Sequence, residues 1–333
     1  MSEPEQGVAT EHAVVTKAGA GAARPRVAIF APNPLLTVTL EREGERERIH
    51  FHAGGQGVWV ARMAASLGAE PVLCGFAGGE SGELLGGLLA KLAGELRLVA
   101  STSPSGCYVT DRRSGERELV GCALSEPPSR HELDELFSLT CAEAIATGWL
   151  VVTNPLPGEA LPLEVYGDLV ADARAGGART LVDLSSPRLD SALRGEPDLV
   201  KLNDWELAQF VCGPVSEPAQ LRAAAERLRE QGAGTVIVTR GELPGLVLAG
   251  DRAWQLRPPP LERGFREGCG DAMMGALAAC LARGESLESA LITGAAAGAA
   301  NFLRRGLGSA SRDVVEQLVS SVALEPLSGR RPA

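Results

Sequence analysis

The sequence predicts an α/β fold, with a mainly parallel sheet covered by helices on both faces. Short apolar runs alternate with longer helical stretches along most of the 333 residues, as is typical of parallel strands buried on both sides. A composition that is 45% hydrophobic can supply a large core within a single domain of this size. Two glycine-rich turns, each opening a helix, add a candidate ligand site to this framework.

The ordered domain is predicted to span residues 25–325. Residues 1–24 are polar, rich in glycine and alanine and without periodicity, which predicts a disordered tail, and 326–333 are assigned to a flexible C-terminal tail. Buried strands are expected at 27–30, 72–75, 144–152, 180–184, 199–202 and 236–239. Helices are expected at 83–92, 162–175 and 218–231.

Two charged, alternating segments interrupt this rhythm, at 37–51 and 107–122. Each contains a turn signal, Glu43-Gly44 in the first and Ser114-Gly115 in the second. Alternation around such a turn is typical of a β-hairpin. The sequence therefore predicts two hairpins in addition to the main sheet.

The most informative turn is Gly268-Cys269-Gly270-Asp271, followed by the alanine-rich run 272–282. Two glycines around one small residue let backbone N–H groups approach an anion, and the following helix adds its positive end. The carboxylate of Asp271 can take the proton of an attacking hydroxyl while those N–H groups hold a transferred phosphate. This arrangement suits phosphoryl transfer. The alternative is an ordinary glycine-rich loop capped by an aspartate.

A second glycine cluster, at 54–57, opens an amphipathic helix that is predicted to end at Gly68. Such a turn allows the backbone to approach a ligand closely. Polar residues also follow the predicted strands, where ligands of parallel sheets collect. These residues are Asn33, Asn154, Asn203 and Thr239.

Together these motifs resemble the ribokinase-like, or PfkB, carbohydrate kinase family, whose signatures are an early GG-x-G turn and a late G-A-G-D turn. The segment 32–36 is similar to the N-P-A-L-D of the 1-phosphofructokinase and tagatose-phosphate kinase branch. Residues 201–207 are similar to the K-P-N-x-x-E-L motif, and 239–241 to the S/T-L-G nucleotide turn. The motifs occur in the family's order between about residues 26 and 318.

The resemblance implies a ribokinase-like three-layer sandwich with a small β lid, formed by segments near 37–52 and 106–122. Such lids exclude water, whose attack would waste ATP; the alternative is a pair of surface hairpins. It also implies an ATP- and Mg²⁺-dependent kinase that phosphorylates a hydroxyl of a sugar or sugar-like molecule. Asp271 would act as the base, beside an anion hole formed by Gly268, Cys269 and Gly270.

The same resemblance assigns further residues. The positions implied in nucleotide binding are Lys201, Asn203, Glu206, Thr239, Gly241 and Asn301. Glu206 would hold the metal through its water shell, the alternative being that Asn203 and Glu206 are only an N-cap and a first-turn acid. The positions implied in acceptor binding are Asn33, Thr37, Gly54, Gly55, Gln56 and Trp59.

The chain departs from the family on the acceptor side. Thr37 and Trp59 occupy positions where the branch has an Asp and an Asn that bind sugar hydroxyls, and Gln56, Gly106 and Thr110 stand where it has cations. We therefore expect phosphorylated sugars to be poor acceptors, because their phosphate loses its charged partners.

The nucleotide turn departs as well, because Arg266-Glu267 replaces a D-T pair. An acid at this place should weaken ATP binding unless Arg266 or Mg²⁺ compensates.

Two alternatives remain open at this point. The acceptor could be a nucleoside or another ring-bearing alcohol, which is favoured if Trp59 faces the pocket. The chain could instead be a catalytically degenerate member that binds a nucleotide or metabolite. A dinucleotide oxidoreductase is excluded, since no G-x-G-x-x-G follows the first strand.

The resemblance implies a small-molecule acceptor and ATP as partners, and the composition argues against other classes of partner. A net charge of −10 with dispersed arginines argues against nucleic-acid binding. No segment is long and apolar enough for a membrane span, and no signal pattern opens the chain, so we expect no membrane association and a cytoplasmic protein. The seven cysteines lack metal-site spacing and are interpreted as reduced thiols. The predicted assembly is a homodimer through the lid.

Overall fold

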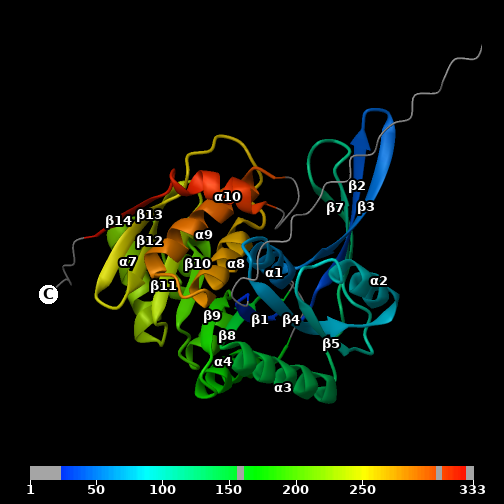
Figure 1. The fold of residues 1–333 in the computed structure, drawn as a ribbon, viewed down its shortest axis with the longest axis horizontal. Helices are drawn as coiled ribbons and strands as arrows, with labels where there is room; N and C mark the ends of the chain where they lie inside the picture. Colours follow the sequence, from blue (N-terminus) through cyan, green and yellow to red (C-terminus); the bar gives the residue numbers. More distant parts are fainter. Residues whose placement is uncertain (1–23, 156–160, 305–309, 328–333) are drawn as a thin grey trace, which may run out of the picture.

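In the computed structural model the described residues are 24–155, 161–304 and 310–327. They form a ten-stranded sheet with helices on both faces and a separate four-stranded sheet (Figure 1). The predicted tails, 1–24 and 326–333, lie almost entirely outside the described residues. The C-terminal boundary differs slightly, because the last strand ends at Pro326 and the N–H of Leu327 donates to Ala253 O at 2.8 Å.

The large sheet is parallel over most of its width. From one edge to the other, its strands are β14 (Ala323–Pro326), β13 (Arg252–Arg257), β12 (Leu243–Ala249), β11 (Thr235–Arg240), β10 (Leu199–Asn203), β9 (Arg179–Asp183), β8 (Trp149–Thr153), β1 (Arg26–Phe30), β4 (Glu70–Ala77) and β5 (Glu95–Ala100). Neighbours from β11 to β5 pair in parallel, whereas β12, β13 and β14 add antiparallel pairs at one edge. These three edge strands were not predicted, and neither was β5 at the opposite edge.

Alternate strand residues point into two cores, one for each helical layer. One layer contains α3 (Arg130–Thr147), α4 (Glu164–Ala175), α5 (Arg188–Leu193), α6 (Asp204–Val211) and α7 (Pro218–Glu230). The other contains α1 (Gln56–Ser66), α2 (Gly79–Leu89), α8 (Cys269–Ala282) and α9 (Leu287–Phe302), with α10 (Arg312–Val319) packed outside them. On β1, for example, Phe30 packs in the first core and Ile29 in the second. The predicted fold class is confirmed.

One predicted strand began too early. Residues 144–147 belong to α3, which starts with a capping box between Ser129 and Glu132 and ends at Gly148 in the left-handed conformation (φ 74°). Strand β8 then begins at Trp149. The apolar end of a buried helix and a buried strand look alike in sequence, so periodicity could not separate them.

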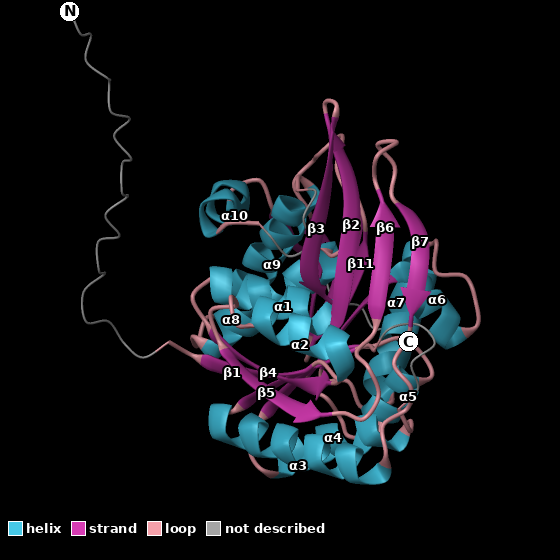
Figure 2. Ribbon diagram, turned by 90° about the vertical axis from the view of Figure 1, so that its right-hand side faces the viewer, coloured by secondary structure: helices cyan, strands magenta, loops and turns pink. Residues whose placement is uncertain are grey.

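The small sheet contains the two predicted hairpins, in the order β3-β2-β6-β7. Its strands are β2 (Leu35–Glu43), β3 (Arg46–Gly54), β6 (Cys107–Asp111) and β7 (Glu118–Ala123). Strands β2 and β6 pair in parallel and join the hairpins. The sheet projects from the α/β body beside α1 and α2 (Figure 2).

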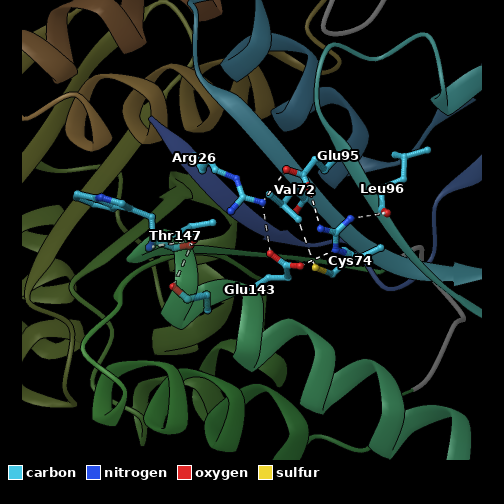
Figure 3. A network of polar contacts seen from close by, with 10 residues as sticks. Arg26, Val72, Cys74, Glu95, Leu96, Glu143 and Thr147 are labelled. Atoms are coloured by element: carbon cyan, nitrogen blue, oxygen red, sulfur yellow. Dashed lines mark hydrogen bonds and ion pairs between the residues drawn. The ribbon is translucent and has the colours of Figure 1, made fainter. Parts of the chain in front are cut away.

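A polar network ties together β1, β5 and α3 (Figure 3). The guanidinium of Arg26 lies 2.8 Å from Glu95 and 3.6 Å from Glu143. Arg97 pairs with Glu143 at 2.5 Å and also contacts Glu95. The hydrogen bond with Glu143 is the main reason that the pKa of Arg97 is raised. Two cations and two carboxylates therefore neutralise each other near the amino ends of β1 and β5.

Candidate active site

A cavity of about 540 Å³ opens at the carboxyl ends of β9, β10 and β11, against the start of α8. This position is where parallel sheets bind their ligands, and the volume suits a nucleotide-sized molecule. The predicted residues that line it are Gln56, Lys201, Asn203, Glu206, Thr239, Gly241, Cys269, Gly270 and Asp271. The fold thus gathers segments that are far apart in the sequence around one cavity.

The start of α8 is built to receive an anion. Its N-cap, Gly268, has a left-handed backbone (φ 75°), and no side chain caps the helix. The first N–H groups of a helix have no acceptor within it, and they carry the positive end of the helix dipole. A Cβ added to Gly270 would lie only 2.6 Å from Lys201 Nζ. The glycine therefore lets the ammonium group approach the helix start.

Lys201 is buried. Its ammonium lies 2.5 Å from Asp183 Oδ2, and the two side chains are only 6% and 4% exposed. Burial opposes the charged ammonium, but Asp183 and Asp271 outweigh it and raise the pKa of Lys201. Sequence analysis missed Asp183 as a site residue. Its signal was an acid at the carboxyl end of the predicted strand 180–184.

Asp271 lies in the first turn of α8 and is 8% exposed. Burial, followed by repulsion from Asp183, raises the pKa of Asp271 to about 7, while Lys201 and a hydrogen bond from Gln56 act in the opposite direction. A carboxyl group with a pKa near the working pH can both take up and release a proton. Its electrostatic environment therefore suits a general base.

Asn203 and Glu206 form a reciprocal capping box at the start of α6. Glu206 N donates to Asn203 Oδ1 at 2.9 Å, and Asn203 N donates to Glu206 Oε2 at 2.8 Å. Burial is the main cause of the raised pKa of Glu206, and Asp183 adds to it. The two residues therefore do form an N-cap and a first-turn acid, which was the structural alternative to a role in the site. Both residues also line the cavity.

The residues present fit a nucleotide and its metal ion. Within the described ranges, no group of three or more His, Cys, Asp or Glu side chains is placed to hold a metal by itself. Mg²⁺ in phosphate sites usually keeps several waters and binds one or two carboxylates together with the phosphates. Asp183 and Glu206 offer such carboxylates beside the start of α8, which no side chain caps.

Two residues predicted to bind the nucleotide lie at the end of β11. Thr239 ends the parallel pairing of this strand and its hydroxyl donates to Leu202 O at 3.4 Å, while Gly241 follows in a left-handed turn (φ 61°). Asn301 is fully buried and is not among the residues that line the cavity. Its amide instead donates to Glu267 O at 2.9 Å. Asn301 therefore supports the turn before α8 from behind.

Arg266 and Glu267, which stand where the family has a D-T pair, contact different parts of the protein. Arg266 lines the cavity and lies 3.3 Å from Glu242. Glu267 does not line the cavity, and its carboxylate lies 4.0 Å from Arg117, in the turn between β6 and β7. Arg112, in the same turn, lies over Phe265, 5.9 Å from the ring centre. This turn of the small sheet thus contacts the segment that precedes α8.

The residues predicted to bind the acceptor lie at the base of the small sheet and the start of α1. Asn33, Gly55 and Gln56 share a small niche next to the main cavity. A Cβ on Gly54 would lie 2.8 Å from Thr37 Oγ1, so these two positions are in contact. Trp59, on α1, is partly exposed and is not among the residues lining the main cavity or the niche.

Gln56, Gly106 and Thr110 are the three positions at which the family resemblance leads one to expect a cation. Gly106 accepts a backbone hydrogen bond from Leu36, and Thr110 is buried with its hydroxyl 3.2 Å from that of Thr39. Gln56 Oε1 accepts a hydrogen bond from Asn154 N at 2.7 Å. None of these three positions supplies a positive charge.

The helices of the described residues are all too short or too polar to cross a membrane. All seven cysteines are free thiols.

Comparisons with known proteins agree on one family. The profile of the pfkB family carbohydrate kinases matches residues 33–313. The chain is 32% identical over 275 residues to the ATP-dependent 6-phosphofructokinase isozyme 2 of Escherichia coli (strain K12), a match that covers 80% of this chain and 87% of that protein. It is 31% identical over 230 residues to the 1-phosphofructokinase of Rhodobacter capsulatus, covering 68% and 72% respectively.

Solved structures show the same relationship. The structure of phosphofructokinase-2 from Escherichia coli in complex with potassium superposes with a TM-score of 0.79 at 29% identity, covering 89% of this chain and 98% of that one. A tetrameric inhibited form of the same enzyme gives a TM-score of 0.78 at 28% identity, with the same coverage.

Proposed function

Because the chain belongs to the pfkB family of carbohydrate kinases, which phosphorylate sugars with ATP, we propose that it transfers the γ-phosphate of ATP to a hydroxyl of an uncharged sugar or sugar-like molecule. The observation that carries this proposal is Asp271 at the start of α8, with a pKa of about 7 and Lys201 beside it. A base, a cation and free helix N–H groups meet there.

In this mechanism Asp271 takes the proton of the acceptor hydroxyl as its oxygen attacks the phosphate. The N–H groups at the start of α8 and the ammonium of Lys201 offset the negative charge on the transferred group. Mg²⁺, when bound with ATP, supplies further charge neutralisation at the phosphates. Asp183 and Glu206 would hold that ion, either directly or through water.

The acceptor is proposed to be uncharged because the expected phosphate partners are absent. By name, the relatives are phosphofructokinases, so their acceptors carry a phosphate. A charge-assisted contact contributes about 1.5–3 kcal/mol. Neutral residues at Gln56, Gly106 and Thr110 remove up to three such contacts.

The test is an acceptor screen with purified protein, ATP and Mg²⁺. Fructose, tagatose and ribose are compared with fructose 1-phosphate, fructose 6-phosphate and tagatose 6-phosphate by coupled ADP release, with Asp271→Asn as the background. We expect an unphosphorylated sugar to be the better acceptor. A kcat/KM of about 10⁴ M⁻¹s⁻¹ or more for any of the phosphosugars would contradict the proposal.

The alternatives receive less support. A nucleoside or other ring-bearing acceptor depended on Trp59 facing the pocket, and Trp59 is not among its lining residues. A catalytically degenerate protein would have no need to keep Asp183, Lys201 and Asp271 buried together, since burying charges costs free energy.

We also propose that the lid mediates a homodimer, in the cytoplasm where ATP is supplied. Val38 faces Phe51 and Leu40 faces Ile49 on one side of the lid. Ile49 and Phe51 are 60% and 53% exposed. An exposed apolar sheet face is typical of an interaction surface. Light scattering should give a dimer mass for the wild type and a monomer mass for Phe51→Glu; a monomeric wild type would contradict the assembly.

A further inference from the structure

A cavity of about 310 Å³, the α1–α2 groove, lies between the side chains of α1 and those at the end of α2 (Figure 2). Val58 and Leu89 of its lining are buried, whereas Leu88 and Leu92 are partly exposed. The described residues that line it include no acid, and all of them differ from those that line the main cavity. A volume of this size can hold a small organic molecule.

Arg62, on α1, brings a guanidinium group to this largely aliphatic groove. The residue is only partly exposed. Burial lowers the pKa of Arg62, and no carboxylate of the described residues opposes this shift. Within the same residues, the guanidinium has no hydrogen bond or ion pair. Such a cation is unusual, because a charge that is removed from water is normally paired.

The surroundings of Arg62 add positive rather than negative charge. The pKa of His52, on β3, is lowered mainly by burial and next by repulsion from Arg62, while Glu41 acts on it in the opposite direction. Lys91 also lines the groove, but it is exposed, so water screens its charge. Arg62 is therefore the partly buried cation that a bound anion would neutralise.

We infer that the α1–α2 groove binds a small amphipathic carboxylate, whose head group pairs with Arg62 and whose apolar body covers the leucines of α2. The planar guanidinium can hold both oxygens of a carboxylate. A monoanion matches one cation, whereas a phosphate monoester carries nearly two charges at neutral pH. Burial of the apolar body adds the hydrophobic contribution. This site does not depend on the proposed function, because it can be occupied without turnover.

The first test is equilibrium dialysis of the purified protein with ¹⁴C-octanoate. We expect saturable binding at one site. Acetate has the head group without the body, octanol has the body without the head group, and inorganic phosphate is a different anion. Each should displace the label at least about tenfold less effectively than unlabelled octanoate. Absence of saturable binding would overturn the site. Equal displacement by octanol would overturn the contact with Arg62, and equal displacement by acetate or phosphate would overturn the apolar contact.

The second test places the site on the protein. Arg62→Gln should weaken octanoate binding by about tenfold or more, and Arg62→Lys by less, because the lysine keeps the charge. The matched control is Arg130→Gln on α3, where the side chain is 94% exposed and the affinity should not change. Circular dichroism melting shows that each variant is folded.

Saturating ATP with Mg²⁺ should leave octanoate binding unchanged, since the described residues that line the two cavities are different. Displacement of octanoate by ATP, or equal affinity of the wild type and Arg62→Gln, would overturn the assignment to the α1–α2 groove. If no sugar is phosphorylated and octanoate still binds through Arg62, the proposed function fails and this site stands.

Discussion

Two groups of charged residues occupy the same sheet and are organised in opposite ways. Near the amino ends of β1 and β5, Arg26 and Arg97 are matched by Glu95 and Glu143. At the carboxyl ends of β9 and β10, the ammonium of Lys201 faces three carboxylates, those of Asp183, Asp271 and Glu206. The first group is balanced, whereas the second carries an excess of buried negative charge.

This difference separates a structural role from a catalytic one. In the balanced group each ion has a partner, and half-exposed side chains such as Arg97, 36% exposed, remain close to water. In the unbalanced group, burial and repulsion raise the pKa of Asp271 to about 7. An arrangement that opposes folding but prepares a base is typical of a functional site. Three substitutions test this comparison.

The largest effect is expected at the base. Asp271→Asn removes the proton acceptor, so the rate of phosphoryl transfer should fall by about 10² to 10⁴. Nucleotide affinity should change little, since the helix N–H groups and Lys201 remain. Steady-state kinetics with the best acceptor, and calorimetry with ATP, measure the two effects. Slow ATP hydrolysis serves as the assay if no acceptor is found. Turnover at the wild-type rate would remove Asp271 from the role of base.

The same substitution should affect stability in a pH-dependent way. The pKa of Asp271 is raised from 3.8 to about 7 on folding, so its ionisation opposes folding and stability is lost as the pH rises between these values. Asp271→Asn should therefore melt at a higher temperature than the wild type at pH 8, and the two should converge towards pH 4. Melting curves with equal differences at both pH values would contradict the raised pKa.

The next effect is expected at the cation. Lys201→Met leaves three carboxylates without their buried partner, and breaking such a pair costs about 3–5 kcal/mol. Because Lys201 lowers the pKa of Asp271, any remaining activity should also require a higher pH. Urea denaturation and a pH–rate profile measure these changes. Lys91→Met, at an exposed lysine, is the control. Equal stability of the two variants would show that the charges are not coupled.

The smallest effect is expected in the balanced group. Glu143→Gln weakens the pairing with Arg97 and Arg26, but these guanidinium groups remain near solvent, so the loss should be about 1 kcal/mol. The kcat/KM should not change, because the network does not line the cavity. Thermal unfolding and kinetics are measured on the same preparation. A loss of activity without a loss of stability would mean that the two groups are coupled.

Local sequence signals predicted much of this structure. The alternation of strands and helices identified six of the seven parallel strands, all except β5 at the edge, and Gly44 and Gly115 marked the turns of the two hairpins. The edge strands β12, β13 and β14 were missed, because β12 contains a proline and a glycine, and β14 is four residues long. Their pairing depends on distant neighbours that no local pattern reveals.

The candidate site was likewise predictable from the sequence only in part. The sequence by itself determined the glycine turn before α8 and the capping box of Asn203 and Glu206, because both depend on backbone preferences and contacts within a few residues. Only the tertiary structure decided that Asp183 pairs with Lys201, and that Gln56 and Asp271, 215 positions apart in the chain, line the same cavity. Strand order and the packing of α1 against α8 bring these groups together, and burial there changes their charge states.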